Sequence, residues 1–178
     1  MKFKKTKLIT SSIVVLGLSA YLIFNQWNKS SVTIEEKPNG LNLEDGDGVV
    51  IPVIEIDEER TIPVEEEFPS SMEEYGIQEA IHGMSHQKVK AEDKWGFIPM
   101  THERISRLIV VVEENKYISA PVYLDILNRW SNNDFSRVDE DHNAIWDLQE
   151  GNVGRATGIM SFEEERDFIK EHFKIENE

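Results

Sequence analysis

The stretch that decides the fold is SSMEEYGIQEAIHGMSH, residues 70–86. Its apolar residues recur at intervals of three and four, the spacing of one buried helix face. They are Ile77, Ala80, Ile81 and Met84. Ser70, with Glu73 three residues later, matches the capping box that begins many helices. The stretch therefore predicts an amphipathic helix that packs against other helices.

Four segments further along the chain carry the same two signs. Each begins with a residue whose side-chain oxygen can cap a helix, namely Thr101, Ser119, Ser136 and Ser161. The apolar residues with helical spacing are Ile105, Leu108, Ile109 and Val112, then Tyr123, Leu127 and Trp130, then Val138, Ile145 and Leu148, and finally Phe162, Ile169 and Phe173. The run 108–112 also fits a strand, but the caps around it favour a helix. We predict a mostly α chain in which residues 70–178 form a small all-α domain of about five helices.

Residues 28–69 differ from this domain in composition. Residues 28–70 hold 12 acidic and three basic side chains together with four prolines. Like charges extend such a segment, and little apolar surface is available to bury. Two Ile-Pro-Val steps, at 51–53 and 62–64, are less polar, but their prolines argue against a central strand. We predict a disordered acidic tether over 28–69; the alternative is an edge strand that adds to the domain or to a partner.

The N-terminal segment has the features of a membrane anchor. No charged residue occurs from Leu8 to Phe24, and extending the run to Trp27 reaches the roughly 20 residues that a helix needs to cross a bilayer. The lysines at 2, 4, 5 and 7 precede the run, which predicts a cytoplasmic N-terminus and an extracytoplasmic C-terminal domain. A cleaved signal peptide is the alternative, but Leu18 would stand where a small residue is preferred. We predict that residues 1–27 form a single-pass transmembrane signal-anchor of the cell membrane, with membrane contact through residues 8–27.

Beyond this segment the chain is strongly acidic. Residues 28–178 carry 15 basic and 34 acidic side chains, so nucleic acid is not an expected partner. A basic protein partner or a divalent cation would be attracted instead. The sequence contains no cysteine, which excludes disulfides, thiolate metal sites and a cysteine nucleophile.

One stripe of the first predicted helix carries potential metal ligands. Glu79, His82 and His86 are separated by three and four residues, so they share a helix face. Two imidazoles at i and i+4 can bind one divalent metal, and the Glu79 carboxylate can add an oxygen ligand. A third ligand must come from elsewhere in the chain, such as His142 or His102, and we include His142 among the predicted ligands. The other interpretation is that both histidines flank the apolar face, make ordinary hydrogen bonds and hold no cofactor.

Two further motifs are weaker. Residues 139–150 place acidic or amide side chains at positions 1, 3, 5, 9 and 12 of a calcium-binding loop. However, Ala144 stands where that loop needs glycine, and an acidic helix explains the same residues. The glycines at 151, 154 and 158 could cradle an anion before a helix. They match no phosphate-binding pattern, and Gly151 fits the end of a helix better.

Several stretches resemble a family of small uncharacterised proteins from spore-forming Gram-positive bacteria. They are IHGMSHQKVKA at 81–91, KWG at 94–96, DHNAIW at 141–146 and GRATG at 154–158. The resemblance covers roughly residues 72–173 and implies an N-terminal anchor and an outer domain to which no activity is assigned. Since no complete catalytic motif occurs, we expect a membrane-anchored extracytoplasmic interaction or sensor module without enzymatic activity. The alternative function is metal binding, or a metal-dependent activity, through His82 and His86.

Overall fold

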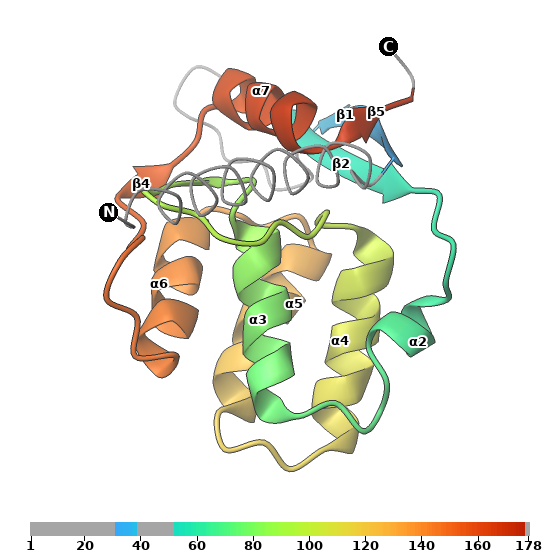
Figure 1. Cartoon of the computed structure of the whole chain (residues 1–178), viewed down its shortest axis with the longest axis vertical. Coiled ribbons are helices and arrows are strands. Elements are labelled where there is room, and N and C mark those ends of the chain that lie inside the picture. Colours follow the sequence, from blue (N-terminus) through green and yellow to red (C-terminus); the bar gives the residue numbers. More distant parts are fainter. Residues whose placement is uncertain (1–30, 39–51, 177–178) are drawn as a thin grey trace, which may run out of the picture. The chain divides into compact units, whose positions relative to one another are not determined.

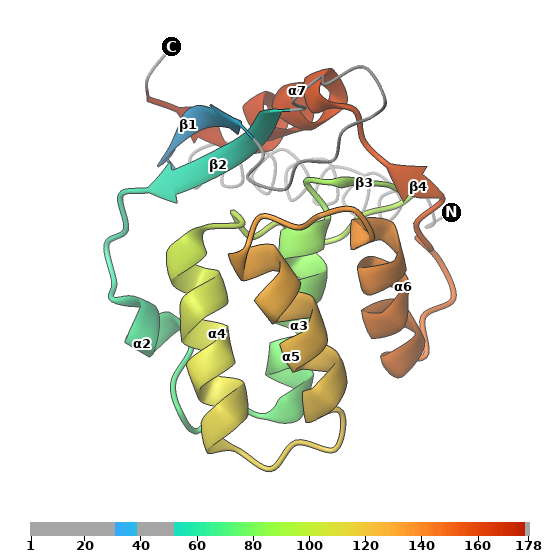
Figure 2. The ribbon, with the colours of Figure 1, turned by 180° about the vertical axis from the view of Figure 1, so that it is seen from behind.

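The computed structural model describes residues 31–38 and 52–176. Four helices make up one side of the described part, as Figures 1 and 2 show from opposite directions. They are α3 (Glu74–Ser85), α4 (His102–Glu114), α5 (Ala120–Ser131) and α6 (Val138–Leu148). A short helix α2 (Val64–Glu67) precedes them, and α7 (Phe162–His172) lies beside the strands at the opposite end.

Two small sheets complete the described fold. The larger has the strand order β2-β1-β5, with bounds Ser31–Pro38 for β1, Pro52–Glu58 for β2 and Lys174–Ile175 for β5. Strands β1 and β2 are antiparallel, with Ile34 opposite Ile56, while β1 and β5 are parallel. The smaller sheet pairs β3 (Val89–Lys90) with β4 (Gly158–Ile159) in antiparallel fashion.

The predicted helix faces are confirmed in the helical core. The face of α3 is buried in full, and those of α4, α5 and α6 supply most of the other large buried side chains. The run 108–112, which also fitted a strand, lies inside α4. Leu148 is the exception: at the end of α6 its side chain is 39% exposed. The core is therefore built from the periodic apolar residues of 77–145, as an amphipathic helix bundle requires.

Helix starts were predicted with mixed success. Thr101 caps α4 by accepting from the Arg104 amide, and Ser161 forms the predicted capping box with Glu164 on α7. The capping box predicted at Ser70 is wrong, because α3 begins at Glu74 and the Ser70 hydroxyl instead donates to the Glu114 carboxylate of α4 at 2.9 Å. The cap predicted at Ser136 is also wrong: the Ser136 hydroxyl donates to Asp134, and Arg137 precedes the first residue of α6.

The prediction of a disordered tether over 28–69, followed by an all-α domain from residue 70, is wrong for the described part of that segment. Residues 31–38 and 52–58 pair as strands, and Ser31–Glu178 forms one compact unit. Val32, Ile54 and Ile56 pack with Ile169 and Phe173 in a second apolar cluster. The prolines at 38 and 52 stand opposite each other at the end of the ladder, where a missing N–H costs little.

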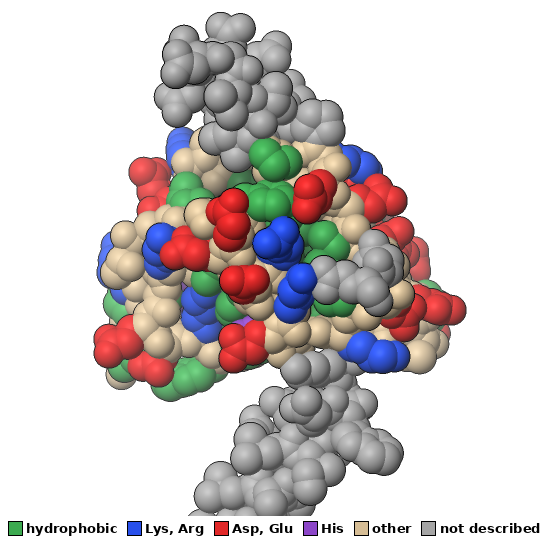
Figure 3. Space-filling view, turned by 90° about the horizontal axis from the view of Figure 1, so that it is seen from above, with side chains coloured by type: hydrophobic (Ala, Val, Ile, Leu, Met, Phe, Trp, Pro, Cys, Tyr) green, Lys and Arg blue, Asp and Glu red, His purple; other side chains and the backbone are tan. Residues whose placement is uncertain are grey.

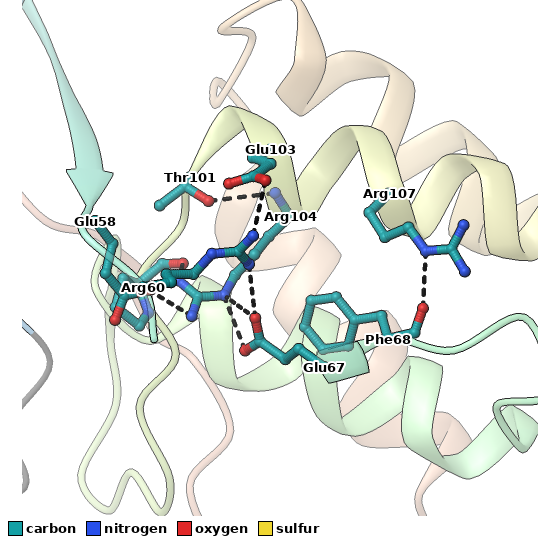
Figure 4. Close-up of polar contacts among 9 residues, drawn as sticks. Glu58, Arg60, Glu67, Phe68, Thr101, Glu103, Arg104 and Arg107 are labelled. Carbon is teal, nitrogen blue, oxygen red and sulfur yellow. Dashed lines mark hydrogen bonds and ion pairs between the residues drawn. The ribbon is translucent and has the colours of Figure 1, made fainter. Parts of the chain in front are cut away.

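A group of ion pairs ties these N-terminal elements to α4 (Figure 4). The buried guanidinium of Arg104 contacts Glu58 at the end of β2 at 2.5 Å and Glu67 of α2 at 3.0 Å. Arg60 contacts Glu67 at 2.9 Å and Glu103 at 2.8 Å. Two cations thus meet three carboxylates, which holds the segment before residue 70 against the helical core.

One face of the described part carries charges of both signs (Figure 3). On the face seen from above in Figure 3, acidic and basic side chains alternate with small hydrophobic areas. No helix within 31–38 and 52–176 has the length and apolar character needed to cross a membrane. The predicted anchor at 8–27 lies outside the described residues.

Candidate metal centre

Three histidines from two parts of the chain meet beside the helical core. His82 lies in the last turn of α3, His86 follows that helix directly, and His142 belongs to α6. The ring centroids of His82 and His86 are 4.8 Å apart, and His142 lies 4.4 Å from His82 and 5.4 Å from His86. One ring nitrogen of each lies within 4.8 Å of those of the other two. The structure thus brings together three of the four residues predicted as ligands.

The positions of these rings are set by core residues that are close to the histidines in sequence on the same helices. Ile81 precedes His82, Ile145 follows His142 by three residues, and both isoleucines are fully buried in the same apolar cluster. His142 shares that buried face and is itself 0% exposed, while His86 is 3% exposed. His82 is only partly buried, so one side of the group reaches the surface.

Gln149 fixes the tautomer of His82. The amide nitrogen of Gln149 donates to Glu79 Oε1 at 2.6 Å, so its amide oxygen is the atom that lies 2.6 Å from His82 Nδ1. A carbonyl oxygen only accepts, so Nδ1 of His82 carries the proton. In the neutral ring, Nε2 then carries an unshared lone pair.

Asn143 fixes the tautomer of His142 in the same way. The Asn143 amide nitrogen donates to the Ala156 carbonyl at 3.0 Å, and its oxygen accepts from the Ala156 amide at 2.8 Å. These two hydrogen bonds to Ala156 orient the Asn143 side chain. The Asn143 amide oxygen lies 3.3 Å from His142 Nδ1. The proton of His142 therefore belongs on Nδ1, and its Nε2 is again a lone-pair donor.

A backbone carbonyl fixes the third ring. His86 Nδ1 donates to the carbonyl oxygen of Gly96 at 2.7 Å. The loop that provides this carbonyl is held in place because Lys94 Nζ donates to the His86 carbonyl oxygen at 2.9 Å. All three histidines thus use Nδ1 for an oxygen acceptor, which is the arrangement typical of metal-bound imidazoles.

The Nε2 atoms of two rings face each other. His82 Nε2 and His142 Nε2 are 2.9 Å apart. A hydrogen bond between them requires one ring to move its proton from Nδ1, which leaves a lone pair opposite an amide oxygen. A cation between the rings satisfies both lone pairs and keeps both outer hydrogen bonds. The arrangement therefore favours a bound cation.

Burial keeps the rings of His86 and His142 neutral, and a histidine that binds a metal must be neutral. Burial lowers the pKa of His86 to about 3, against the opposing effect of its hydrogen bond to Gly96. Burial also lowers the pKa of His142 to about 4, with smaller contributions from His82, Lys94 and Arg155. At neutral pH both rings are uncharged donors.

The spacing fits a tetrahedral ion after a small movement. Imidazole nitrogens bind zinc at about 2.0–2.1 Å, which separates two ligands of a tetrahedral site by about 3.3 Å. The present 2.9 Å between His82 Nε2 and His142 Nε2 would have to open by about 0.4 Å. The ligand nitrogens of the group lie within 4.8 Å of one another, so the widest separation would also have to close, by up to about 1.5 Å. His82 is partly exposed, so its ring has room to move.

Glu79, the fourth predicted ligand, takes a different place. Its carboxylate accepts from Gln149, which in turn accepts from His82. Glu79 is thus linked to the histidines through the Gln149 amide. It does not belong to the group of three potential ligands that converge among the described residues. Its negative charge supports the Nδ1–H tautomer of His82 through that amide.

A pocket of about 250 Å³ opens beside the histidines. His82 and His86 line it, whereas His142 is buried behind them. Glu79, Asp93 and Trp95 also line the pocket. The inner side of the group is closed by protein, and its outer side faces this pocket.

Sequence reasoning missed the residues that orient the rings. Gln149 occupies no ligand position of a metal-binding pattern, Asn143 matches only position 5 of a calcium-binding loop, and Gly96 acts only through its backbone carbonyl. A signal for Asn143 was its position next to His142, but its role depends on Ala156, 13 residues away. Such partners become visible only when α3, α6 and the loops have been placed.

The weaker motifs have structural explanations. Residues 139–148 belong to α6, so the calcium-loop interpretation is wrong and the acidic-helix interpretation is confirmed. Gly151 closes that helix: its amide donates to the Trp146 carbonyl at 2.9 Å, and its backbone lies against the Trp146 ring. Gly154 has a φ of +87° and lies against the Asp93 carbonyl, where a Cβ would be 2.4 Å from that oxygen.

A comparison with protein families identifies the family of the chain. Residues 81–170 match the family of unknown function DUF6241, which is 90 of the 178 residues. The chain belongs to this family. The three histidines lie inside the matched region, while β1, β2 and α2 lie before it. No curated protein and no solved structure matches the chain.

Proposed function

We propose that this protein binds one divalent transition-metal ion through His82, His86 and His142. The observation that carries the proposal is the direction of the ring nitrogens. Each Nδ1 faces an oxygen acceptor, and the Nε2 atoms of His82 and His142 lie 2.9 Å apart. A ring nitrogen of His86 lies within 4.8 Å of the ligand nitrogens of the other two. This is the pattern of ligands with supporting hydrogen bonds in histidine metal sites.

The donor set selects the kind of metal. Three neutral imidazoles suit zinc, cobalt, nickel or copper, whereas magnesium and calcium prefer carboxylate and carbonyl oxygens. Three protein ligands leave the fourth position of a tetrahedral ion available, as in metal sites that take water or a ligand. We therefore propose zinc or a metal of similar preference.

The test is a calorimetric titration of the full chain with Zn²⁺ at pH 7.5, in mild detergent and after removal of chelator. We expect one ion per chain. His82→Gln removes one ligand at a partly exposed position and should weaken binding at least about 100-fold. The matched control is His102→Ala, since His102 lies 3.4 Å from Glu55 and takes no part in the group. Equal affinity of His82→Gln and His102→Ala would refute the proposal.

We also propose that residues 8–27 anchor the chain in a membrane, with the metal-binding part outside the cytoplasm. The support is the uncharged run from Leu8 to Phe24 and the lysines before it. In this setting the metal site would serve an interaction or sensor module. Protease added to intact protoplasts should degrade the chain beyond residue 28, and full protection would contradict the orientation.

A further inference from the structure

The most exposed large side chain of the pocket beside the histidines is that of Trp95. Trp95 is 77% exposed, although it lies in a loop that is fixed on both sides. Before it, the Asp93 carbonyl packs against Gly154, and Lys94 donates to the His86 carbonyl. After it, the Gly96 carbonyl accepts from His86 Nδ1. The indole is therefore held at the pocket although most of its surface is open to solvent.

The other tryptophan of the pocket differs in this respect. Trp146 packs against the Gly151 backbone, its Nε1 donates to the Val153 carbonyl at 2.8 Å, and the Arg155 guanidinium lies 5.2 Å from its ring centre. Its ring is in contact with protein. Tyr75 also lines the pocket and is 63% exposed, but its hydroxyl is hydrogen-bonded to Glu79. Trp95 is thus the more exposed of the two aromatic side chains that remain available to a ligand, and an exposed large aromatic side chain at a pocket is a typical contact site.

The charge of the pocket limits what can enter. Glu79 and Asp93 line it, and no lysine or arginine does among the described residues. A phosphate or other polyanion would meet two carboxylates with no cationic side chain in the lining to oppose them. A ligand that reaches the metal should therefore be neutral or carry a single negative charge on its oxygen donor.

We propose that the open metal position and Trp95 together bind a small ligand that has an oxygen-donor group next to an aryl ring. The oxygen completes the coordination of the ion held by His82, His86 and His142, and the ring packs on the indole. The pocket volume of about 250 Å³ lies just below the roughly 300–1,000 Å³ of pockets for drug-sized ligands, which limits the ligand to a small molecule. This inference rests on the metal site proposed above.

The test uses cobalt as the metal and two hydroxamates as probes. Full chain loaded with Co²⁺ has visible absorption bands that report the coordination of the ion. Benzohydroxamate offers an oxygen donor with an aryl ring, and acetohydroxamate offers the same donor without it. We expect both to change the cobalt spectrum, benzohydroxamate to bind more tightly, and inorganic phosphate to have no effect at millimolar concentration.

Substitution of the tryptophan separates the two parts of the ligand. Trp95→Ala should weaken benzohydroxamate roughly 10-fold and leave acetohydroxamate unchanged. The matched control is Ile118→Ala, because Ile118 is 92% exposed and is not part of the pocket lining. Equal loss of both hydroxamates, or of neither, in Trp95→Ala would overturn the role of the ring.

The inference and the proposed metal site fail in different ways. If cobalt binds but neither hydroxamate changes its spectrum, the coordination is closed, and this inference is refuted while the metal site stands. If phosphate alone changes the spectrum, the ligand class is wrong. If cobalt does not bind at all, the proposed metal site is refuted together with the ligand.

Discussion

The group around Arg104 and the group of three histidines both join separate elements through buried polar side chains, yet their polar atoms find partners in different ways. Around Arg104, guanidinium groups meet carboxylates at 2.5–3.0 Å, so opposite charges compensate. Among the histidines, two lone-pair nitrogens face each other at 2.9 Å. Opposite charges compensate within the first group, so we assign it a structural role. For the second group we propose a bound cation.

The largest expected loss of stability concerns the ion pairs around Arg104. Arg104→Leu removes the shared cation and leaves Glu58, which has a 7% exposed side chain, without its partner. We expect the free energy of unfolding to fall by about 3 to 5 kcal/mol, the usual result of breaking a buried pair. Denaturant unfolding of the full chain measures it. The control Lys37→Ala breaks the exposed pair with Glu55 and should cost under about 1 kcal/mol. Similar small losses in both variants would contradict the structural role.

A slightly smaller effect tests whether β2 belongs to the fold. Ile56 is 4% exposed in the second apolar cluster, whereas Ile62 in the following segment is 48% exposed. Ile56→Ala should destabilise the full chain by about 3 kcal/mol, and Ile62→Ala by less than about 0.5 kcal/mol. Chemical unfolding of the two variants decides between a sheet and a tether, since a tether predicts the same small change for both.

The contrast between the helices and the strands shows what the sequence could predict. In α3, four apolar residues share one face, so periodicity alone indicated both the helix and its buried side. In β1, Val32 and Ile34 are followed by three charged residues, and the cover for this strand comes from Ile169 and Phe173 near the other end of the chain. A short strand whose packing partners are more than 130 residues away has no local signal of burial.

The residues of the candidate site also differ in whether local sequence spacing could predict them. His82 and His86 were found because four residues separate them on one helix, and His142 because it shares the buried face of Val138 and Ile145. Glu79 was predicted as a ligand on the same spacing, but Gln149 stands between it and His82. Helical spacing predicts which side chains share a face; it does not predict which amide from another segment inserts between them.

Zinc should stabilise the chain by mass action. With free Zn²⁺ at about 100 times its dissociation constant, the free energy of unfolding should rise by about 2.7 kcal/mol. His82→Gln should show no such rise, because it lacks one of the three ligands. Thermal unfolding with and without zinc measures both. A rise of equal size in the variant would place the zinc elsewhere.

Without metal, stability should fall as the solution is acidified. The pKa values of His86 and His142 are lowered to about 3 and about 4 by burial, so the unfolded chain binds protons that the folded chain does not between these values and pH 6.5. Folding is therefore weakened as pH drops through this window, by about 2 kcal/mol between pH 6.5 and 5.5 for the two rings together.

Unfolding with denaturant across this pH range, in the presence of chelator, provides the measurement. His102→Ala should keep the loss, and His142→Asn should reduce it by about half, because one of the two titrating rings is gone. A stability that stays constant down to pH 5.5 would show that the rings are not held in their neutral form.

The smallest expected effect concerns the residue that orients His82. Gln149→Ala removes the acceptor for Nδ1 but no metal ligand, so zinc affinity should fall about 10-fold, or about 1.4 kcal/mol. Asn152→Ala is the matched control, since Asn152 also lines the pocket but, among the described residues, is not hydrogen-bonded to any of the three rings. Calorimetric titration compares the two. Unchanged affinity in Gln149→Ala would mean that its amide does not set the tautomer.

The most direct measurement is a crystal structure of the chain grown with Zn²⁺, with anomalous diffraction data collected on both sides of the zinc absorption edge. We predict one anomalous peak about 2.0–2.1 Å from a ring nitrogen of each of His82, His86 and His142, with the fourth position directed into the pocket. Each Nδ1 should remain hydrogen-bonded to its oxygen acceptor. No peak among the three rings at saturating zinc, with His82 Nε2 and His142 Nε2 still about 2.9 Å apart, would contradict the metal site.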